Sequence, residues 1–163
     1  MNNAEVQNLL DGCATELTQV KALIDGLGMG SNINPYLTKY ALIRACGTIE
    51  QAFKTIVADF CSKRCKKQVK RFLELRVRDS SMNPSYQNMV KLLKDFDQCW
   101  ADNFKASIDA SADKAAWMLS LQSLVDARND FSHGGNPSTT IGDVLIYFAH
   151  SRAMVEIMDA TVV

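Results

Sequence analysis

The chain has 163 residues, of which 47% are hydrophobic, so we expect a single domain, residues 1–163, with one core. No apolar run approaches the roughly 20 residues of a membrane span, and the N-terminus lacks a signal-peptide pattern, so no membrane partner is expected. Five cysteines at scattered spacings favour reduced thiols in a cytoplasmic protein. A net charge of zero would by itself argue against a nucleic-acid partner.

Helical periodicity organises the first half of the chain. Apolar residues at spacings of three and four predict a helix from Ala4 to about Ile24, with Leu23 on the inward stripe. The Gly26-x-Gly28-x-Gly30 stretch ends it. A second apolar stripe predicts a long helix from Pro35 to Phe60, which a basic run follows directly.

Three more helices are predicted in the second half, over Pro84–Trp100, Ala112–Phe131 and Ile141–Ala160. Phe96 and Leu119 are expected to face inward. No segment shows strict alternation with turn chemistry, so strands are not expected. The sequence predicts an all-α, up-and-down bundle of four main helices plus one or two short helices.

Each of the three prolines follows an asparagine, and each pair is expected to lead into a helix. Asparagine caps helices well, and proline suits the first helical position because its missing N–H would be unpaired there. The pairs are Asn34-Pro35, Asn83-Pro84 and Asn136-Pro137. After the third pair the helix is expected to begin later, because Thr140-x-x-Asp143 resembles a capping box.

The neutral total hides a strongly basic segment. Eight basic residues and one acidic residue lie between Lys63 and Arg78, so this segment carries a charge of about +7 and the remainder about −7. Such a stripe of lysine and arginine favours binding of RNA phosphates. The alternatives are a solvated helix face and a docking surface for an acidic partner protein. The candidate RNA-binding residues, at helical spacings, are Lys63, Lys66, Lys67, Lys70 and Arg71.

The candidate catalytic residues are Arg128 and His133, in the sequence Arg-Asn-Asp-Phe-Ser-His that Gly134-Gly135 follows. They lie five residues apart, about 140° on an ideal helix, and the glycines end the helix so that His133 is free to turn. Arginine binds phosphate oxygens in two places, and histidine transfers protons near neutral pH. Together they suffice for metal-free RNA cleavage. The alternative is that both cations only complement the negative end of the helix dipole.

Several nearby residues are candidates for supporting roles. Asn129 lies four residues from His133, on the same helix face, and could hydrogen-bond the imidazole. Asp130 could restrain Arg128, and Ser132 could contact phosphate. Arg44 and Glu50, on the second helix, lie about 120° apart, so they cannot both face one site. Glu50 would orient Arg128 or His133, or form a plain ion pair.

No metal or cofactor site is predicted. Cys61 and Cys65 lack further ligands at a zinc-like spacing, and His150 has no partner histidine. The Gly26-x-Gly28-x-Gly30 stretch lacks the lysine and the preceding strand of a phosphate-binding loop.

An all-helical chain of this length, with Arg-Asn-x-x-x-His between its last two long helices, resembles the HEPN superfamily. The superfamily signature is an arginine, usually followed by a polar residue, and then a histidine after four to six residues; Arg128, Asn129 and His133 match it. The Arg44-x-x-Gly47-x-x-Glu50 stretch is similar to the prokaryotic RNase- and toxin-like branch, which includes the RiboL-PSP type.

The resemblance implies a homodimer in which two such motifs form one composite RNase site. It implies a toxin or phage-defence effector that cleaves RNA, with an antitoxin or a larger defence complex as a possible partner. Other members of the superfamily have lost activity. The alternative is therefore a non-catalytic module that binds a nucleotide or a protein partner.

Overall fold

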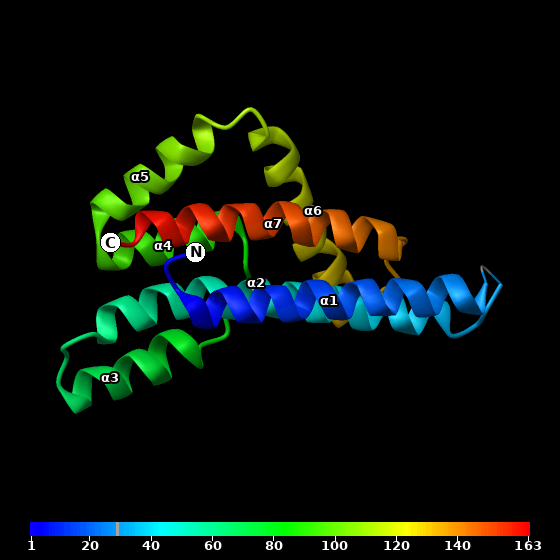
Figure 1. Ribbon diagram of the computed structural model, residues 1–163, viewed down its shortest axis with the longest axis horizontal. Helices are drawn as coiled ribbons and strands as arrows, with labels where there is room; N and C mark the ends of the chain where they lie inside the picture. The colour runs from blue at the N-terminus through cyan, green and yellow to red at the C-terminus, as the bar shows by residue number, and fades with distance from the viewer. Residues whose placement is uncertain (29) are drawn as a thin grey trace.

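The computed structural model describes residues 1–28 and 30–163, and within these residues it contains helices and no strand (Figure 1). The all-α prediction is therefore confirmed. In chain order the elements are α1 (Ala4–Leu27), α2 (Asn34–Ser62), α3 (Lys67–Leu73), the π-helical turn η1 (Glu74–Arg78), α4 (Tyr86–Phe96), α5 (Gln98–Asp109), α6 (Lys114–Ser132) and α7 (Ile141–Thr161).

Four long helices build the bundle, as predicted. Helix α2 packs against α1, α6 and α7, and α7 also packs against α1 and α6. Figure 1 shows α1 and α2 running side by side in opposite directions, with α7 along them. The described residues hold three shorter α-helices, one more than the upper end of the prediction.

Helix α2 is the centre of the core. Every residue from Ala52 to Ala58 is buried, because neighbouring helices cover α2 on several sides. Each large side chain that is fully buried stabilises the fold by about 1.5–3 kcal/mol. The largest are Phe53, Phe104, Leu10, Leu17, Leu42 and Ile49.

The region predicted as one helix over Pro84–Trp100 forms two. Asp97 takes an extended conformation, with φ −153° and ψ 120°, and its side chain accepts a hydrogen bond of 2.7 Å from the Cys99 N–H. Aspartate is a favourable N-cap, so it ends α4 and starts α5.

The Asn34-Pro35 pair leads into α2 as predicted, with proline among the first two helical residues, but asparagine is not the N-cap. Asn34 lies inside α2 and donates its side-chain N–H to the Gly28 carbonyl at 2.8 Å, so Ile33 precedes the helix. Pro84 comes before α4, which Ser85 caps by accepting from Asn88 N–H. The later start after Asn136-Pro137 is confirmed by a capping box at the start of α7.

Three large apolar side chains that were predicted to face inward are exposed: Leu23, Phe96 and Leu119. Leu119 is 69% exposed because the first half of α6 diverges from the bundle (Figure 1). The second half of α6 returns to the core through Leu121, Leu124 and neighbouring residues. None of the described helices is long and apolar enough to cross a membrane.

Candidate active site at the end of helix α6

The predicted motif lies where α6 ends. His133 follows the last helical residue, with φ −92° and ψ 13°, and its N–H donates to the carbonyls of Asn129 and Asp130 at 3.0 and 3.2 Å. Gly134 has a φ of +86°, a conformation that favours glycine. Its N–H donates to the Phe131 carbonyl at 3.0 Å. The helix thus stops one residue before His133, whose side chain is exposed to solvent.

Arg128 is half-buried beside the motif, with 29% of its side chain exposed. Its Nη1 donates a long hydrogen bond of 3.3 Å to Asn129 Oδ1. The Asn129 amide oxygen is therefore turned toward the arginine, and it forms no hydrogen bond with the imidazole in the described structure. The predicted Asn129–His133 bond is wrong because the guanidinium is the competing donor.

Glu50 of α2 faces Arg128 across the contact between α2 and α6. The Glu50 Oε2 atom lies 3.7 Å from Arg128 Nη2, so the two groups form an ion pair without a tight hydrogen bond. The pairing balances the guanidinium charge while leaving most of its N–H groups free to bind an anion. The structure thus brings together two candidates that are 78 positions apart in the chain.

A buried lysine holds Glu50 in place. Lys54 Nζ lies 3.0 Å from Glu50 Oε1, and only 5% of the Lys54 side chain is exposed. The same ammonium donates to the Ser80 carbonyl at 2.6 Å. The Met82 N–H donates to Glu50 Oε1 at 2.9 Å. These bonds occupy one carboxylate oxygen completely and direct the other toward Arg128.

Cys46 lies beneath the arginine, one turn before Glu50 on α2. Burial raises the pKa of the Cys46 thiol, while a hydrogen bond with Arg128 acts in the opposite direction. With burial the larger effect, the thiol is neutral at physiological pH and serves as packing below the guanidinium.

Arg44 lies outside this group. Its Nε donates to Glu16 Oε2 of α1 at 2.7 Å, and its Nη1 donates to Thr48 Oγ1 at 2.9 Å. Hydrogen bonds from Tyr40 and Arg44 lower the pKa of the Glu16 carboxyl. Arg44 therefore ties α2 to α1, and the structure does not place it with Arg128.

Asp130 does not restrain Arg128, and the Ser132 hydroxyl is engaged by the helix backbone. The Asp130 carboxylate is exposed and forms no ion pair with Arg128 in the described residues, while its carbonyl accepts from Gly135 N–H at 2.9 Å. The Ser132 hydroxyl donates to the Arg128 carbonyl at 2.8 Å. Both residues therefore brace the end of the helix.

Sequence reasoning missed two lysines. Lys54 was detectable, because a Glu-x-x-x-Lys spacing places both groups on one helix face, here inside an apolar stripe. The role of Lys39 could not be predicted from the sequence, because its ammonium contacts a residue of another helix. It lies 5.2 Å from the centre of the Phe131 ring of α6. No local pattern links positions so far apart.

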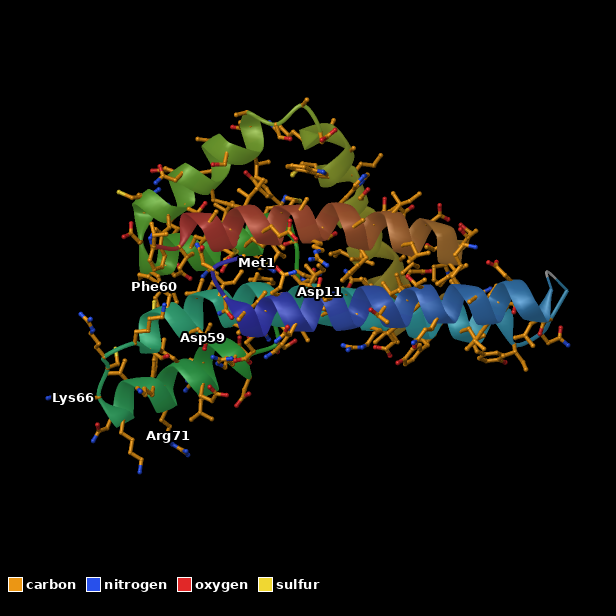
Figure 2. The ribbon with its side chains drawn as sticks, in the orientation of Figure 1. Met1, Asp11, Asp59, Phe60, Lys66 and Arg71 are labelled. Carbon is orange, nitrogen blue, oxygen red and sulfur yellow. The ribbon has the colours of Figure 1, made fainter. Side chains whose placement is uncertain are left out.

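The basic residues occupy a short arm at the far end of α2, formed by the turn after Ser62, α3 and η1. The five candidate RNA-binding residues are all exposed, and Figure 2 shows Lys66 and Arg71 pointing away from the bundle. Arg78 anchors the arm to the bundle through ion pairs with Asp59 of α2 and Glu5 of α1. The arm begins about 18 Å along α2 from Glu50, at 1.5 Å per helical residue.

The described residues contain no group of three or more histidine, cysteine, aspartate or glutamate side chains placed to hold a metal ion. All five cysteines are free thiols.

A comparison with known protein families identifies the family of this chain. A family model described as RiboL-PSP-HEPN matches residues 12–163, a range that includes most of α1, the other long helices and the Arg128–His133 segment. No curated protein and no solved structure gives a significant match. The resemblance to HEPN proteins is confirmed: the chain belongs to the RiboL-PSP-HEPN family.

Proposed function

We propose that the protein is a metal-independent endoribonuclease in which Arg128 and His133 act on a phosphodiester of RNA. The observation that carries the proposal is a half-buried arginine, held by a fixed carboxylate, five residues before an exposed histidine at a helix end. Membership of the RiboL-PSP-HEPN family supports it.

In the proposed reaction the 2′-oxygen of a ribose attacks the adjacent phosphorus, and the bond to the 5′-oxygen of the next nucleotide breaks. His133 takes the proton from the 2′-hydroxyl or gives one to the departing 5′-oxygen. Arg128 stabilises the extra negative charge of the phosphorane through two N–H groups. The products are a 2′,3′-cyclic phosphate and a 5′-hydroxyl. RNA is the implied substrate, because DNA lacks the attacking hydroxyl.

Glu50 and Lys54 act as positioning residues in this proposal. The carboxylate restrains the guanidinium, and the lysine restrains the carboxylate. Since an error of 1 Å in a catalytic group can cost about 100-fold in rate, this restraint matters for catalysis.

One motif supplies one arginine and one histidine, whereas the reaction needs both a base and an acid. A homodimer that brings two motifs together would provide both, and this is the assembly we propose. The exposed arm lysines would bind RNA phosphates away from the cleaved bond. We further propose a cytoplasmic toxin or phage-defence role, in which an antitoxin or a larger defence complex controls the activity.

The test is cleavage of single-stranded RNA in EDTA by purified protein whose oligomeric state has been measured by light scattering. Wild type should cleave the RNA and leave 2′,3′-cyclic phosphate ends. His133→Ala and Arg128→Ala should each lose at least about 100-fold in kcat. His150→Gln, which changes the other histidine, is the matched control and should keep activity. An RNA methylated on its 2′-oxygens should stay intact.

The alternative is a non-catalytic module that binds a nucleotide or a protein partner. It would be supported if the wild-type dimer bound RNA or nucleotides yet left all RNA intact. Cleavage that persisted in His133→Ala would contradict the proposed chemistry directly.

A further inference from the structure

A large cleft lies at one end of the bundle, beside the candidate active site. Its volume is about 1060 Å³, and its walls come from the end of α1, the start of α2 and the loop between α6 and α7. In Figure 1 this is the right-hand end of the bundle, where α7 starts and where α1 and α2 extend beyond it. The loop that forms one wall contains His133, and its residues line the cleft from Asn136 onward.

The lining of the cleft combines an apolar floor with polar walls. Leu42 and Ile141 are buried below it, while hydroxyl side chains such as Ser31 and amide side chains such as Asn136 line its sides. This mixture suits a ligand with both a flat apolar face and many hydrogen-bonding groups. An unpaired nucleotide has both.

Tyr36 offers a surface for a base to stack on. It lines the cleft and is 72% exposed, and its hydroxyl makes no hydrogen bond with the described residues. Exposed aromatic rings in single-strand-binding proteins stack on bases of any sequence.

Lys39 supplies a cation on the same helix face, three residues after Tyr36. Lys21, the other lysine of the cleft, is paired with Asp25. Lys39 forms no ion pair with the described residues, and its ammonium lies over the Phe131 ring. Phe131 belongs to the motif, since it lies between Arg128 and His133 in the chain. A phosphate bound by Lys39 would therefore lie close to the motif.

We propose that this cleft binds an unpaired nucleotide next to the cleaved phosphodiester, with Tyr36 stacked on its base and Lys39 on its phosphate. The inference rests on the proposed nuclease function and adds a substrate-binding site to it. It implies that the protein acts on single-stranded RNA, because a paired base cannot stack on Tyr36.

The experiment measures binding of a fluorescein-labelled 12-nucleotide single-stranded RNA to the full chain by anisotropy. His133→Ala is the parent, so that the RNA stays intact. Adding Tyr36→Ala should raise Kd about 5- to 150-fold, whereas Tyr36→Phe should keep it near the parent value. Adding Lys39→Ala should weaken binding and reduce the slope of log K against log salt by about 0.7.

Lys94→Ala is the matched control, because Lys94 is an exposed lysine on α4, at the opposite end of the bundle (Figure 1). A 4-thiouridine in the RNA should crosslink to Tyr36 or its neighbours on irradiation. The proposal is overturned if Tyr36→Ala and Lys39→Ala bind like the parent, or if Lys94→Ala weakens binding as much.

The two proposals fail separately. If wild type leaves RNA intact while Tyr36→Ala and Lys39→Ala lose binding, the nuclease proposal fails and the nucleotide site stands. If wild type cleaves RNA, and both variants bind and cleave as wild type does, the nucleotide site alone is wrong.

Discussion

The Glu50 carboxylate faces the Arg128 guanidinium across the contact between α2 and α6, with Oε2 3.7 Å from Nη2. The other oxygen of the same carboxylate receives Lys54 and the Met82 N–H. The proposed catalytic arginine is thus held by a carboxylate that is itself held from two sides. This arrangement determines how each part of the site should respond to substitution.

Replacing Glu50 with glutamine should impair catalysis more than substrate binding. The amide side chain would keep an oxygen for the Met82 N–H, but it would lack the negative charge that restrains Arg128. We expect kcat to fall by up to about 100-fold with a much smaller change in KM. Glu156→Gln, which removes a surface partner of Arg152, is the control and should leave both constants unchanged. An unchanged kcat for Glu50→Gln would show that Arg128 needs no restraint.

Replacing Lys54 with methionine should destabilise the fold strongly. The variant would leave the Glu50 carboxylate, 16% exposed, without its closest cation, and breaking a buried ion pair on one side costs about 3–5 kcal/mol. Urea unfolding of the variant and the wild type measures this loss in the free energy of unfolding. The double variant Glu50→Gln/Lys54→Met should recover part of the loss, because it leaves no unpaired carboxylate. A single variant that lost less than about 1 kcal/mol would contradict the proposed role of the pair.

Removing the charges of the arm should weaken RNA binding without affecting the fold. Lys67, Lys70 and Arg71 are exposed and lie at helical spacings on α3. If each contacts one phosphate, changing all three to alanine should reduce the slope of log K against log salt by about 2. Thermal unfolding should stay within a degree or two of wild type. The matched control changes Lys91, Lys94 and Lys105, three lysines of α4 and α5, and should keep the slope.

Gly134→Ala should destabilise the end of α6. Its φ of +86° strains any residue with a Cβ, at a cost of about 1–2 kcal/mol, although no other atom lies within 4 Å of the added carbon. We expect a loss of activity as well, because relief of the strain would move His133. Gly12→Ala is the opposite control: Gly12 lies inside α1 with open space around it, so alanine should stabilise by about 1 kcal/mol.

The start of α7 should become less stable in acid. Hydrogen bonds from the backbone and then the side chain of Thr140 lower the pKa of the Asp143 carboxyl. The ionised form is therefore favoured in the folded state. Its contribution is fully present above the ordinary aspartate pKa and is lost as the pH falls through the lowered folded value. Asp143→Ala should therefore lower Tm at pH 7 and have a smaller effect near pH 2, as measured by circular dichroism.

The sequence predicted the helices better than their ends. Periodicity located the long helices correctly because each buries a continuous apolar stripe. It missed the break at Asp97, where a capping side chain interrupts a stripe that continues on both sides. It also placed Leu119 inward, although this side chain is 69% exposed in the half of α6 that diverges from the bundle. The apolar pattern of one helix does not predict which other helices will pack against it.

The same limit applies to the site. The motif at the end of α6 was visible because its residues are adjacent in the chain and glycine punctuates them. The hydrogen-bond partners of the motif could not be read from the sequence, because the Asn129 amide accepts a hydrogen bond from Arg128 and does not bond His133. Lys39 and Phe131 come from separate helices, and no spacing rule joins them.

By itself the sequence determined the all-helical architecture, the end of α6 at glycine and the chemistry available in Arg128 and His133. These properties depend on interactions between residues that are close in the chain, which periodicity and capping describe. Only the tertiary structure decided that Glu50 pairs with Arg128 while Arg44 turns to Glu16. That choice depends on which face of α2 each neighbouring helix covers, and packing of the whole core sets those faces.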